Sequence, residues 1–211
     1  MAALILVDLQ NDFLPGGALA VPQGDEVIAV ANAVQEKFPL VLATQDWHPP
    51  EHLSFAEQHP GHEIGEVIQL DALEQILWPV HCVENTAGAE FPAGLDTSRV
   101  DHVFQKGTDR RIDSYSGFFD NGHRKATGLG EYLKRHGVQD VYVLGLATDY
   151  CVKFTALDAV QLGFHTHLIE DGCRGVNLHD GDVSRAVEEM RAAGIEVIKS
   201  SQLPAKNLEE G

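Results

Sequence analysis

The sequence of 211 residues is poor in cysteine, in positive charge and in long apolar runs. Its three cysteines, Cys82, Cys151 and Cys173, are an odd number without zinc-finger spacing, which argues against a disulfide framework and favours a reducing, cytoplasmic setting. Fifteen basic against 32 acidic residues give a net charge of −17, which repels nucleic acid and anionic lipid surfaces. We therefore expect neither a nucleic-acid partner nor a membrane partner.

No segment approaches the roughly 20 apolar residues of a membrane-spanning helix. The apolar start, residues 2–7, has no basic flank and stops at Asp8, so we expect a first strand rather than a signal peptide. Without repeats or linkers, a chain that is 44% hydrophobic and 22% charged is typical of a globular protein. We expect one domain over residues 1–211, with Glu209 and Glu210 in a solvated tail. The sequence does not decide whether the chain forms a homo-oligomer.

Apolar runs typical of strands alternate with segments of helical period. The six runs are Ala3–Val7, Leu40–Ala43, Val100–Phe104, Val141–Leu146, Phe164–Ile169 and Ile195–Ile198. Amphipathic segments occupy residues 27–38, 129–133, 152–160 and 183–190, the last three ending before a glycine. This alternation predicts a three-layer α/β fold, with a mostly parallel sheet of about six strands and helices on both faces. Residues 44–99 interrupt this alternation of strand and helix patterns, and we expect a functional, metal-binding loop region there.

Polar residues capable of chemistry follow four of the predicted strands. Asp8 follows the first, Asp46 and His48 the second, Lys106 the third and Cys151 the fourth. In open α/β sheets, ligands bind beyond the carboxyl ends of the strands. Because these residues are far apart in sequence yet all reach that edge, a catalytic set is a better explanation than core packing.

The residue types of this set predict a Cys-Asp-Lys triad. Cys151 would be the nucleophile, activated as a thiolate by a helix N-terminus. Asp8 would act first as general base and then as general acid. Lys106 would keep Asp8 ionised and lower the pKa of the thiol.

The turn between the fourth strand and its helix predicts two further features. The backbone N–H groups of Ala147 and Cys151 could form an oxyanion hole for the charge that develops on an attacked carbonyl. Thr148 or Asp149 is expected to cap the helix with its side chain.

A second set of residues is typical of a metal site. Asp46 and His48 are two residues apart, so both can point the same way from an extended chain. His81, in a loop restrained by nearby proline and aromatic residues, is the leading third ligand, and His52 or Ser54 could supply a weaker fourth contact. One carboxylate with two imidazoles suits Fe²⁺, Mn²⁺ or Zn²⁺, and the sequence does not distinguish these divalent ions.

The ordered motifs of the chain resemble those of the nicotinamidase/pyrazinamidase family, within the isochorismatase-like cysteine hydrolases. The motifs span nearly the whole chain: residues 8–13 (DLQNDF), 44–49 (TQDWHP), 78–82 (WPVHC), 106–107 (KG), 113–118 (DSYSGF) and 145–152 (GLATDYCV). Each motif alone has little specificity, whereas the ordered set is specific.

The resemblance implies hydrolysis of nicotinamide to nicotinate and ammonia through a thioester on Cys151, and likewise of pyrazinamide to pyrazinoate. It implies that Asp46, His48 and His81 bind a divalent metal whose open site receives the pyridine nitrogen. It further implies that the small-molecule substrate lies against Phe13, Trp78 and Tyr115, that the peptide bond before Ala147 is cis, and that the product enters NAD salvage.

Two alternatives follow from the same motifs. Relatives differ in an additional metal ligand, and here the corresponding stretch offers His52 and Ser54, of which Ser54 is favoured because it lies eight residues past Asp46. The chain could also be another amide hydrolase of the superfamily, or a metal- or ligand-binding module without catalysis.

Overall fold

Six parallel strands form the central sheet of the computed structural model, which describes residues 1–203. Glu209 and Glu210, predicted to lie in a tail, are outside the described residues. The strands are β1 (Ala2–Val7), β2 (Val41–Asp46), β5 (His102–Lys106), β6 (Asp140–Leu146), β7 (His165–Arg174) and β8 (Glu196–Ile198). Their order across the sheet is β5-β2-β1-β6-β7-β8. Each predicted apolar run is therefore a strand of this sheet.

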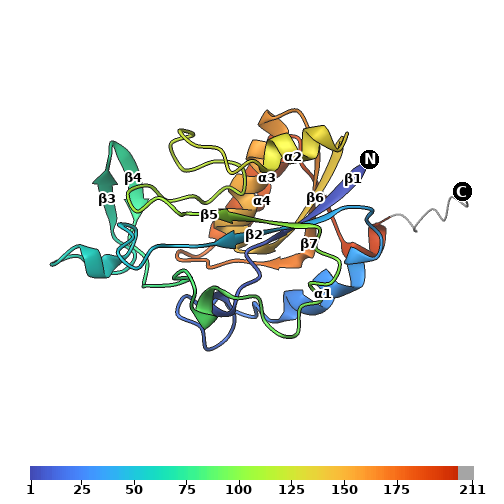
Figure 1. Cartoon of the computed structure of the whole chain (residues 1–211). Coiled ribbons are helices and arrows are strands. Elements are labelled where there is room, and N and C mark those ends of the chain that lie inside the picture. Colours follow the sequence, from blue (N-terminus) through green and yellow to red (C-terminus); the bar gives the residue numbers. More distant parts are fainter. Residues whose placement is uncertain (204–211) are drawn as a thin grey trace, which may run out of the picture.

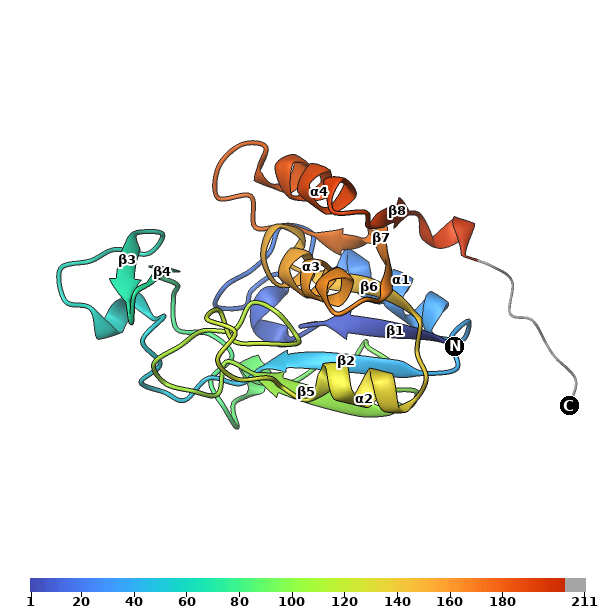
Figure 2. The ribbon, with the colours of Figure 1, turned by 90° about the horizontal axis from the view of Figure 1, so that it is seen from above.

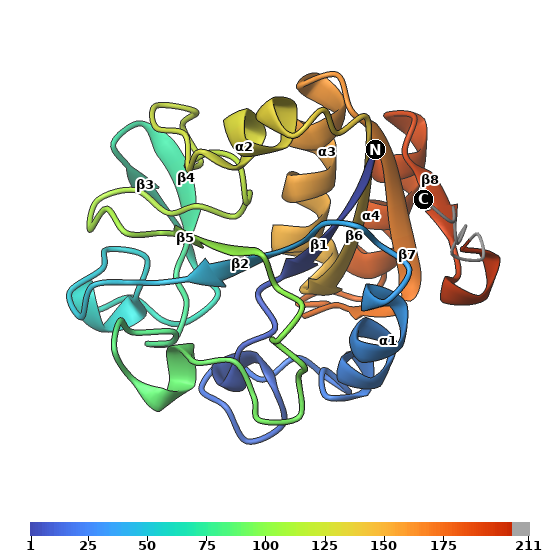
Figure 3. The same cartoon turned by 45° about the vertical axis from the view of Figure 1, so that its right-hand side comes forward.

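Helices cover both faces of the sheet. They are α1 (Glu26–Gln35), α2 (Leu129–Arg135), α3 (Lys153–Gln161) and α4 (Asp182–Ala192). Figures 1 and 3 show α1 on one side of the sheet and α2 and α3 on the other. This arrangement confirms the predicted three-layer α/β architecture. Among residues 1–203, no helix combines the length and apolar character needed to cross a membrane.

The central strands are buried on both faces, which explains their composition. Leu4, Ile5 and Leu6 of β1 are successive residues, and each is fully buried. A strand of a parallel sheet with helices on both sides has no solvent-facing side, so its sequence is continuously apolar rather than alternating.

The region of residues 44–99 contains more regular structure than the sequence predicts. Strands β3 (Val67–Leu70) and β4 (Leu73–Ile76) pair as an antiparallel hairpin. Figure 2 shows this hairpin beyond the end of the sheet toward which the arrows of β1 and β2 point. Short 3₁₀ turns also form at Ala56–Gln58 and Ala87–Ala89. The hairpin was not recognised in the sequence because each of its strands is only four residues long, too short for a clear period, and most of their side chains are exposed or half-buried.

The strand order reverses between β1 and β6. From β1 the chain proceeds to β2 and β5 on one side, and it returns to β6 on the other side of β1. Such a switch point opens a crevice at the carboxyl ends of the two strands, where ligands bind in open α/β sheets. Asp8 follows β1 and Cys151 lies just after β6, so the two residues flank this point.

Candidate active site

The sheet brings Asp8, Asp46, Lys106 and Cys151 together at its carboxyl edge. Asp46 and Lys106 are the last residues of β2 and β5 and are directly paired in the register of these strands. Cys151 lies in a π-helical turn, η4 (Thr148–Val152), that leads into α3. The predicted convergence of the four residues is therefore found in the structure.

The ammonium group of Lys106 is the centre of this cluster. Its Nζ lies 2.8 Å from Oδ2 of Asp8 and 2.6 Å from Oδ1 of Asp46. It also donates to the Ser114 carbonyl at 2.8 Å and lies 3.4 Å from the Cys151 sulfur. Burial acts to lower the pKa of Lys106, but the carboxylates of Asp46 and Asp8 raise it overall. The side chain is therefore a buried cation held between two acids and a thiol.

Burial and Lys106 act in opposite directions on the pKa of Cys151. Burial raises the pKa of the thiol, and although Lys106 opposes this effect, the pKa stays well above 9.0. Burial therefore opposes the predicted thiolate, whereas Lys106 favours it as predicted, and the thiolate stays a prediction. Burial also raises the pKa of Asp8, again against the effect of Lys106. A proton acceptor close to the sulfur is consequently needed at the moment of attack.

The turn after β6 departs from the capping expectation. Among residues 1–203, no side chain caps the π-helical turn, whose N-cap residue is Ala147. The Asp149 carboxylate instead accepts hydrogen bonds from the backbone N–H groups of Val176 (2.9 Å) and Asn177 (2.7 Å). Asp149 therefore joins the loop after β7 to the segment that carries the nucleophile. The peptide bond between Leu146 and Ala147 is cis, as the resemblance implies.

Asp46, His48 and His81, the residues predicted to bind a metal, lie together in the structure. Each offers a ligand atom within 4.8 Å of the others. Oδ2 of Asp46 lies 3.7 Å from Nε2 of His48 and 3.9 Å from Nε2 of His81. These separations are too long for hydrogen bonds, yet two atoms each bound to one zinc ion at about 2.0–2.2 Å can lie that far apart.

The hydrogen bonds of the two imidazoles leave the same nitrogen free in each. Nδ1 of His48 lies 2.9 Å from the Gly107 carbonyl, and Nδ1 of His81 lies 2.8 Å from the Pro79 carbonyl. A carbonyl only accepts, so Nδ1 carries the proton and the Nε2 lone pairs face Asp46. Nε2 of His48 is buried and has no hydrogen-bond partner among the described residues. The residues present therefore fit a divalent metal ion.

Backbone pairing brings the two histidines together from distant segments. The His48 N–H donates to the Cys82 carbonyl at 3.0 Å, and the Glu84 N–H donates to the His48 carbonyl at 2.8 Å. Burial, followed by the positive charge of His48, lowers the pKa of His81 to about 4, so its imidazole is neutral at pH 7. A neutral imidazole is the form that binds a metal.

His52 and Ser54, the two predicted candidates for an additional ligand, contact each other. Nδ1 of His52 lies 2.7 Å from Oγ of Ser54, and its Nε2 lies 3.4 Å from the Ile112 carbonyl. The His52 ring packs on that of His48 at a centroid distance of 4.4 Å, and His48, His52 and Asp113 form a second potential ligand group. A fourth ligand to the first group stays a prediction.

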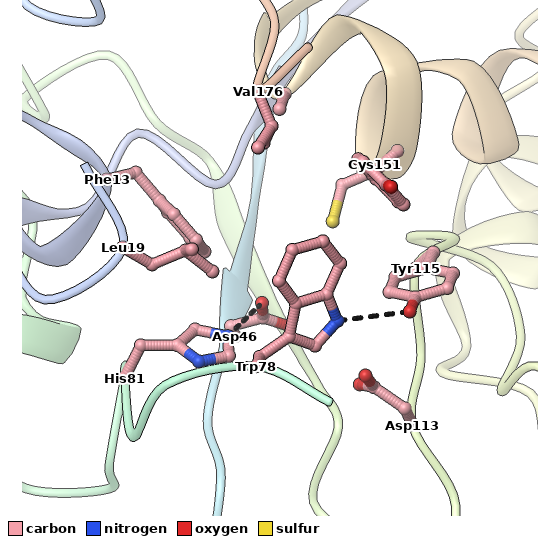
Figure 4. A pocket seen from close by; sticks show the side chains of 11 residues that line it. Phe13, Leu19, Asp46, Trp78, His81, Asp113, Tyr115, Cys151 and Val176 are labelled. Carbon is pink, nitrogen blue, oxygen red and sulfur yellow. Dashed lines mark hydrogen bonds and ion pairs between the residues drawn. The ribbon is translucent and has the colours of Figure 1, made fainter. Parts of the chain in front are cut away.

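A pocket lies between the thiol and the potential metal ligands (Figure 4). Phe13, Trp78 and Tyr115, predicted as its walls, all line it, as do Ala147 and Cys151, predicted as the oxyanion hole. The Trp78 indole N–H donates to the Tyr115 hydroxyl at 3.1 Å. A small, flat ring fits such aromatic walls.

Comparison with known proteins identifies the family. The model of the isochorismatase domain matches residues 2–202. The chain belongs to the isochorismatase family. It is 53% identical over 196 residues to a nicotinamidase from Escherichia coli (strain K12), covering 91% of this chain and 92% of that protein.

Solved structures of isochorismatase-family amidases have the same fold. An Acinetobacter baumanii nicotinamidase/pyrazinamidase superposes with a TM-score of 0.93 at 46% identity, over 96% of this chain and 98% of that chain. A Pyrococcus horikoshii pyrazinamidase in complex with zinc superposes with a TM-score of 0.76 at 40% identity, over 94% of this chain and 98% of that chain.

Sequence reasoning missed several residues of this isochorismatase-family site. Leu19, Tyr150 and Val176 also line the pocket. The Gln10 side chain clamps Asp46, accepting from its backbone N–H and donating to its carbonyl, each at 2.8 Å. Thr44, two residues before Asp46 on β2, contacts Asp8. Side chains two residues apart on a strand point to the same face, so the spacing of Thr44 and Asp46 could have indicated that Thr44 lies near the site. Gln10 is positioned by a loop, where no such periodicity applies.

Proposed function

We propose that this isochorismatase-family enzyme is a nicotinamidase, which hydrolyses nicotinamide to nicotinate and ammonia and accepts pyrazinamide in the same way. The identity to nicotinamidases supports the substrate class. The observation that carries the proposal is the position of the Cys151 sulfur, which shares one pocket with Asp46 and His81 and lies 3.4 Å from Lys106.

The proposed first half-reaction forms a thioester. Asp8 removes the proton from the Cys151 thiol as the sulfur attacks the amide carbon of the substrate. The C–S bond forms, and the carbonyl π electrons move to oxygen, which the N–H groups of Ala147 and Cys151 stabilise. Asp8 then gives the proton to the amide nitrogen, the C–N bond breaks, and ammonia leaves.

The second half-reaction regenerates the thiol. Asp8 removes a proton from a water molecule whose oxygen attacks the thioester carbon, the C–S bond breaks, and the sulfur regains the proton. Lys106 stays protonated throughout and balances the charge of Asp8 and of the sulfur. The products are nicotinate and the free enzyme.

Asp46, His48 and His81 would hold one divalent cation, Zn²⁺, Fe²⁺ or Mn²⁺. When bound, this ion would supply a Lewis acid for the pyridine nitrogen, and its role would be to orient the substrate. Phe13, Trp78 and Tyr115 would sandwich the ring and exclude water from it. We further propose that the enzyme acts in cytoplasmic NAD salvage, a setting consistent with its three free cysteines.

Ammonia release from nicotinamide and from pyrazinamide tests the function. We expect turnover by the wild type and none above background by Cys151→Ala. Cys173→Ala is the matched control, because Cys173 is buried but does not line the pocket. It should retain full activity. If the metal-loaded wild type releases no ammonia from either amide, the proposal is wrong and a binding module without catalysis is favoured.

A further inference from the structure

Asp113 is a buried carboxylate that the proposed mechanism does not use. It is only 3% exposed, and it lies in the segment between β5 and α2. Its oxygens accept hydrogen bonds from the Ser114 backbone N–H (2.7 Å) and from the Gln75 amide (3.3 Å). Within residues 1–203 no lysine or arginine forms an ion pair with it. A buried charge in this position needs a compensating charge from elsewhere.

The Asp113 carboxylate lies close to the potential metal ligands. It lines the same pocket as Asp46 and His81, and Figure 4 shows it turned toward the pocket interior. One of its oxygens, together with ring nitrogens of His48 and His52, forms a group of atoms within 4.8 Å of one another. His48 therefore lies close to two carboxylates, Asp46 and Asp113.

The charges of the buried cluster are unbalanced without a cation. Asp8, Asp46 and Asp113 supply three negative charges when ionised, and Lys106 supplies one positive charge. With the thiol protonated and both imidazoles in the neutral form that binds a metal, the net charge of this set is −2. A divalent ion would neutralise this set. Because Lys106 already occupies Asp8 and one oxygen of Asp46, Asp113 supplies the remaining negative charge near the imidazoles.

We propose that Asp113 is a positioning residue of the metal site, whose negative charge strengthens the binding of a divalent cation by Asp46, His48 and His81. This inference rests on the proposed metal site and extends it by one residue. Residues that surround metal ligands in this way typically change metal affinity by about 10- to 100-fold.

Asp113→Asn isolates the charge from the shape of the side chain. Asparagine keeps an oxygen that can accept from the Ser114 N–H, so the local turn is retained. Asp120→Asn is the matched control. Asp120 is also a buried carboxylate of this segment and accepts from the backbone N–H groups of Gly122 (3.0 Å) and Arg124 (2.9 Å), but it does not line the metal-binding pocket.

The experiment measures Zn²⁺ affinity directly, by competition with a chromophoric chelator on chelator-treated full-length protein. Asp113→Asn is expected to bind Zn²⁺ about 10- to 100-fold more weakly than the wild type, and Asp120→Asn as tightly as the wild type. Thermal unfolding of the metal-free variants checks that both are folded. Should Asp113→Asn fail to fold, Asp113→Ser provides the second uncharged variant.

Asp46→Asn separates the failure of this inference from the failure of the proposed site. If Asp46→Asn binds Zn²⁺ as well as the wild type, the metal site itself is wrong. If Asp46→Asn loses affinity for Zn²⁺ but the folded, uncharged Asp113 variants retain it, only the proposed role of Asp113 is wrong. Equal weakening of Zn²⁺ binding by Asp113→Asn and Asp120→Asn would also overturn the role of Asp113, since the loss of affinity would then not depend on a carboxylate that lines the pocket.

Discussion

Thr44 and Asp8 are joined by a short hydrogen bond inside the protein. The Thr44 hydroxyl donates to Oδ1 of Asp8 at 2.6 Å, while Oδ2 of Asp8 faces Lys106 at 2.8 Å. Both residues are fully buried. Because one oxygen is restrained by Thr44, the carboxylate cannot rotate freely, and the other oxygen stays on the side of the lysine and the thiol. Thr44 therefore sets the orientation of the proposed base.

Removing this hydroxyl is expected to slow the chemical step. Thr44→Val keeps the shape of the side chain but should lower kcat by about 10- to 100-fold, since a hydrogen bond to a charged group is worth about 1.5–3 kcal/mol. The KM for nicotinamide should stay unchanged, because Thr44 does not line the pocket. Steady-state kinetics check both parameters. Thr44→Ser should retain most of the rate, and equal rates for the two variants would contradict an orienting role.

Replacing the central lysine is expected to affect stability as well as activity. Lys106→Met leaves Asp8 and Asp46 buried without their ion-pair partner, so the free energy of unfolding should fall by about 3–5 kcal/mol. Urea denaturation measures this loss, and ammonia release should become undetectable. An unchanged unfolding midpoint would show that the ion pairs contribute little to the fold.

The pH dependence of the reaction should reflect Asp8. Burial raises the pKa of Asp8 above 3.8, and only its ionised form can take the thiol proton. The value of kcat/KM is therefore expected to fall as the pH decreases through this raised pKa, and to be independent of Asp8 at higher pH. The measurement needs excess metal and a metal analysis at each pH, because protons also compete for His48. An acid inflection at or below 3.8 would contradict Asp8 as the base.

Removal of the metal should weaken substrate binding but leave the reactivity of the Cys151 thiol largely unchanged. After treatment with EDTA we expect ammonia release to fall, and added Zn²⁺, Fe²⁺ or Mn²⁺ to restore it. Cys151 should still react with iodoacetamide at a similar rate, because its sulfur is not among the proposed ligands. Rates of alkylation followed by mass spectrometry check this point. Full turnover by exhaustively metal-free protein would exclude the orienting role of the ion.

The edge of the sheet that carries the active site could be predicted because parallel strands all end on the same side. Asp8, Asp46 and Lys106 each lie at or directly after a strand end, so their convergence follows from the order of apolar runs. The proximity of Asp46 and His48, the proposed metal ligands, could be predicted for a similar local reason, namely their spacing along an extended segment.

The loops could not be predicted in the same way. His81 was predicted as the third ligand, but its approach to His48 depends on backbone pairing between segments more than 30 residues apart. Asp113 reaches the same histidine from the segment after β5. The β3–β4 hairpin consists of two four-residue strands, which are too short to show a clear period. Contacts of this kind depend on the closure of long loops, which local sequence does not encode.

The order of apolar and polar residues along the chain was thus sufficient for the α/β architecture and for the identity of the catalytic and ligand candidates, because these depend on local periodicity and spacing. The protonation of Cys151 and the charge balance around His48 depended on tertiary packing. Desolvation and Coulomb interactions vary with burial and with distances between residues that only the folded chain brings together. At Cys151 burial raises the pKa of the thiol and Lys106 lowers it, and the sequence alone shows neither effect.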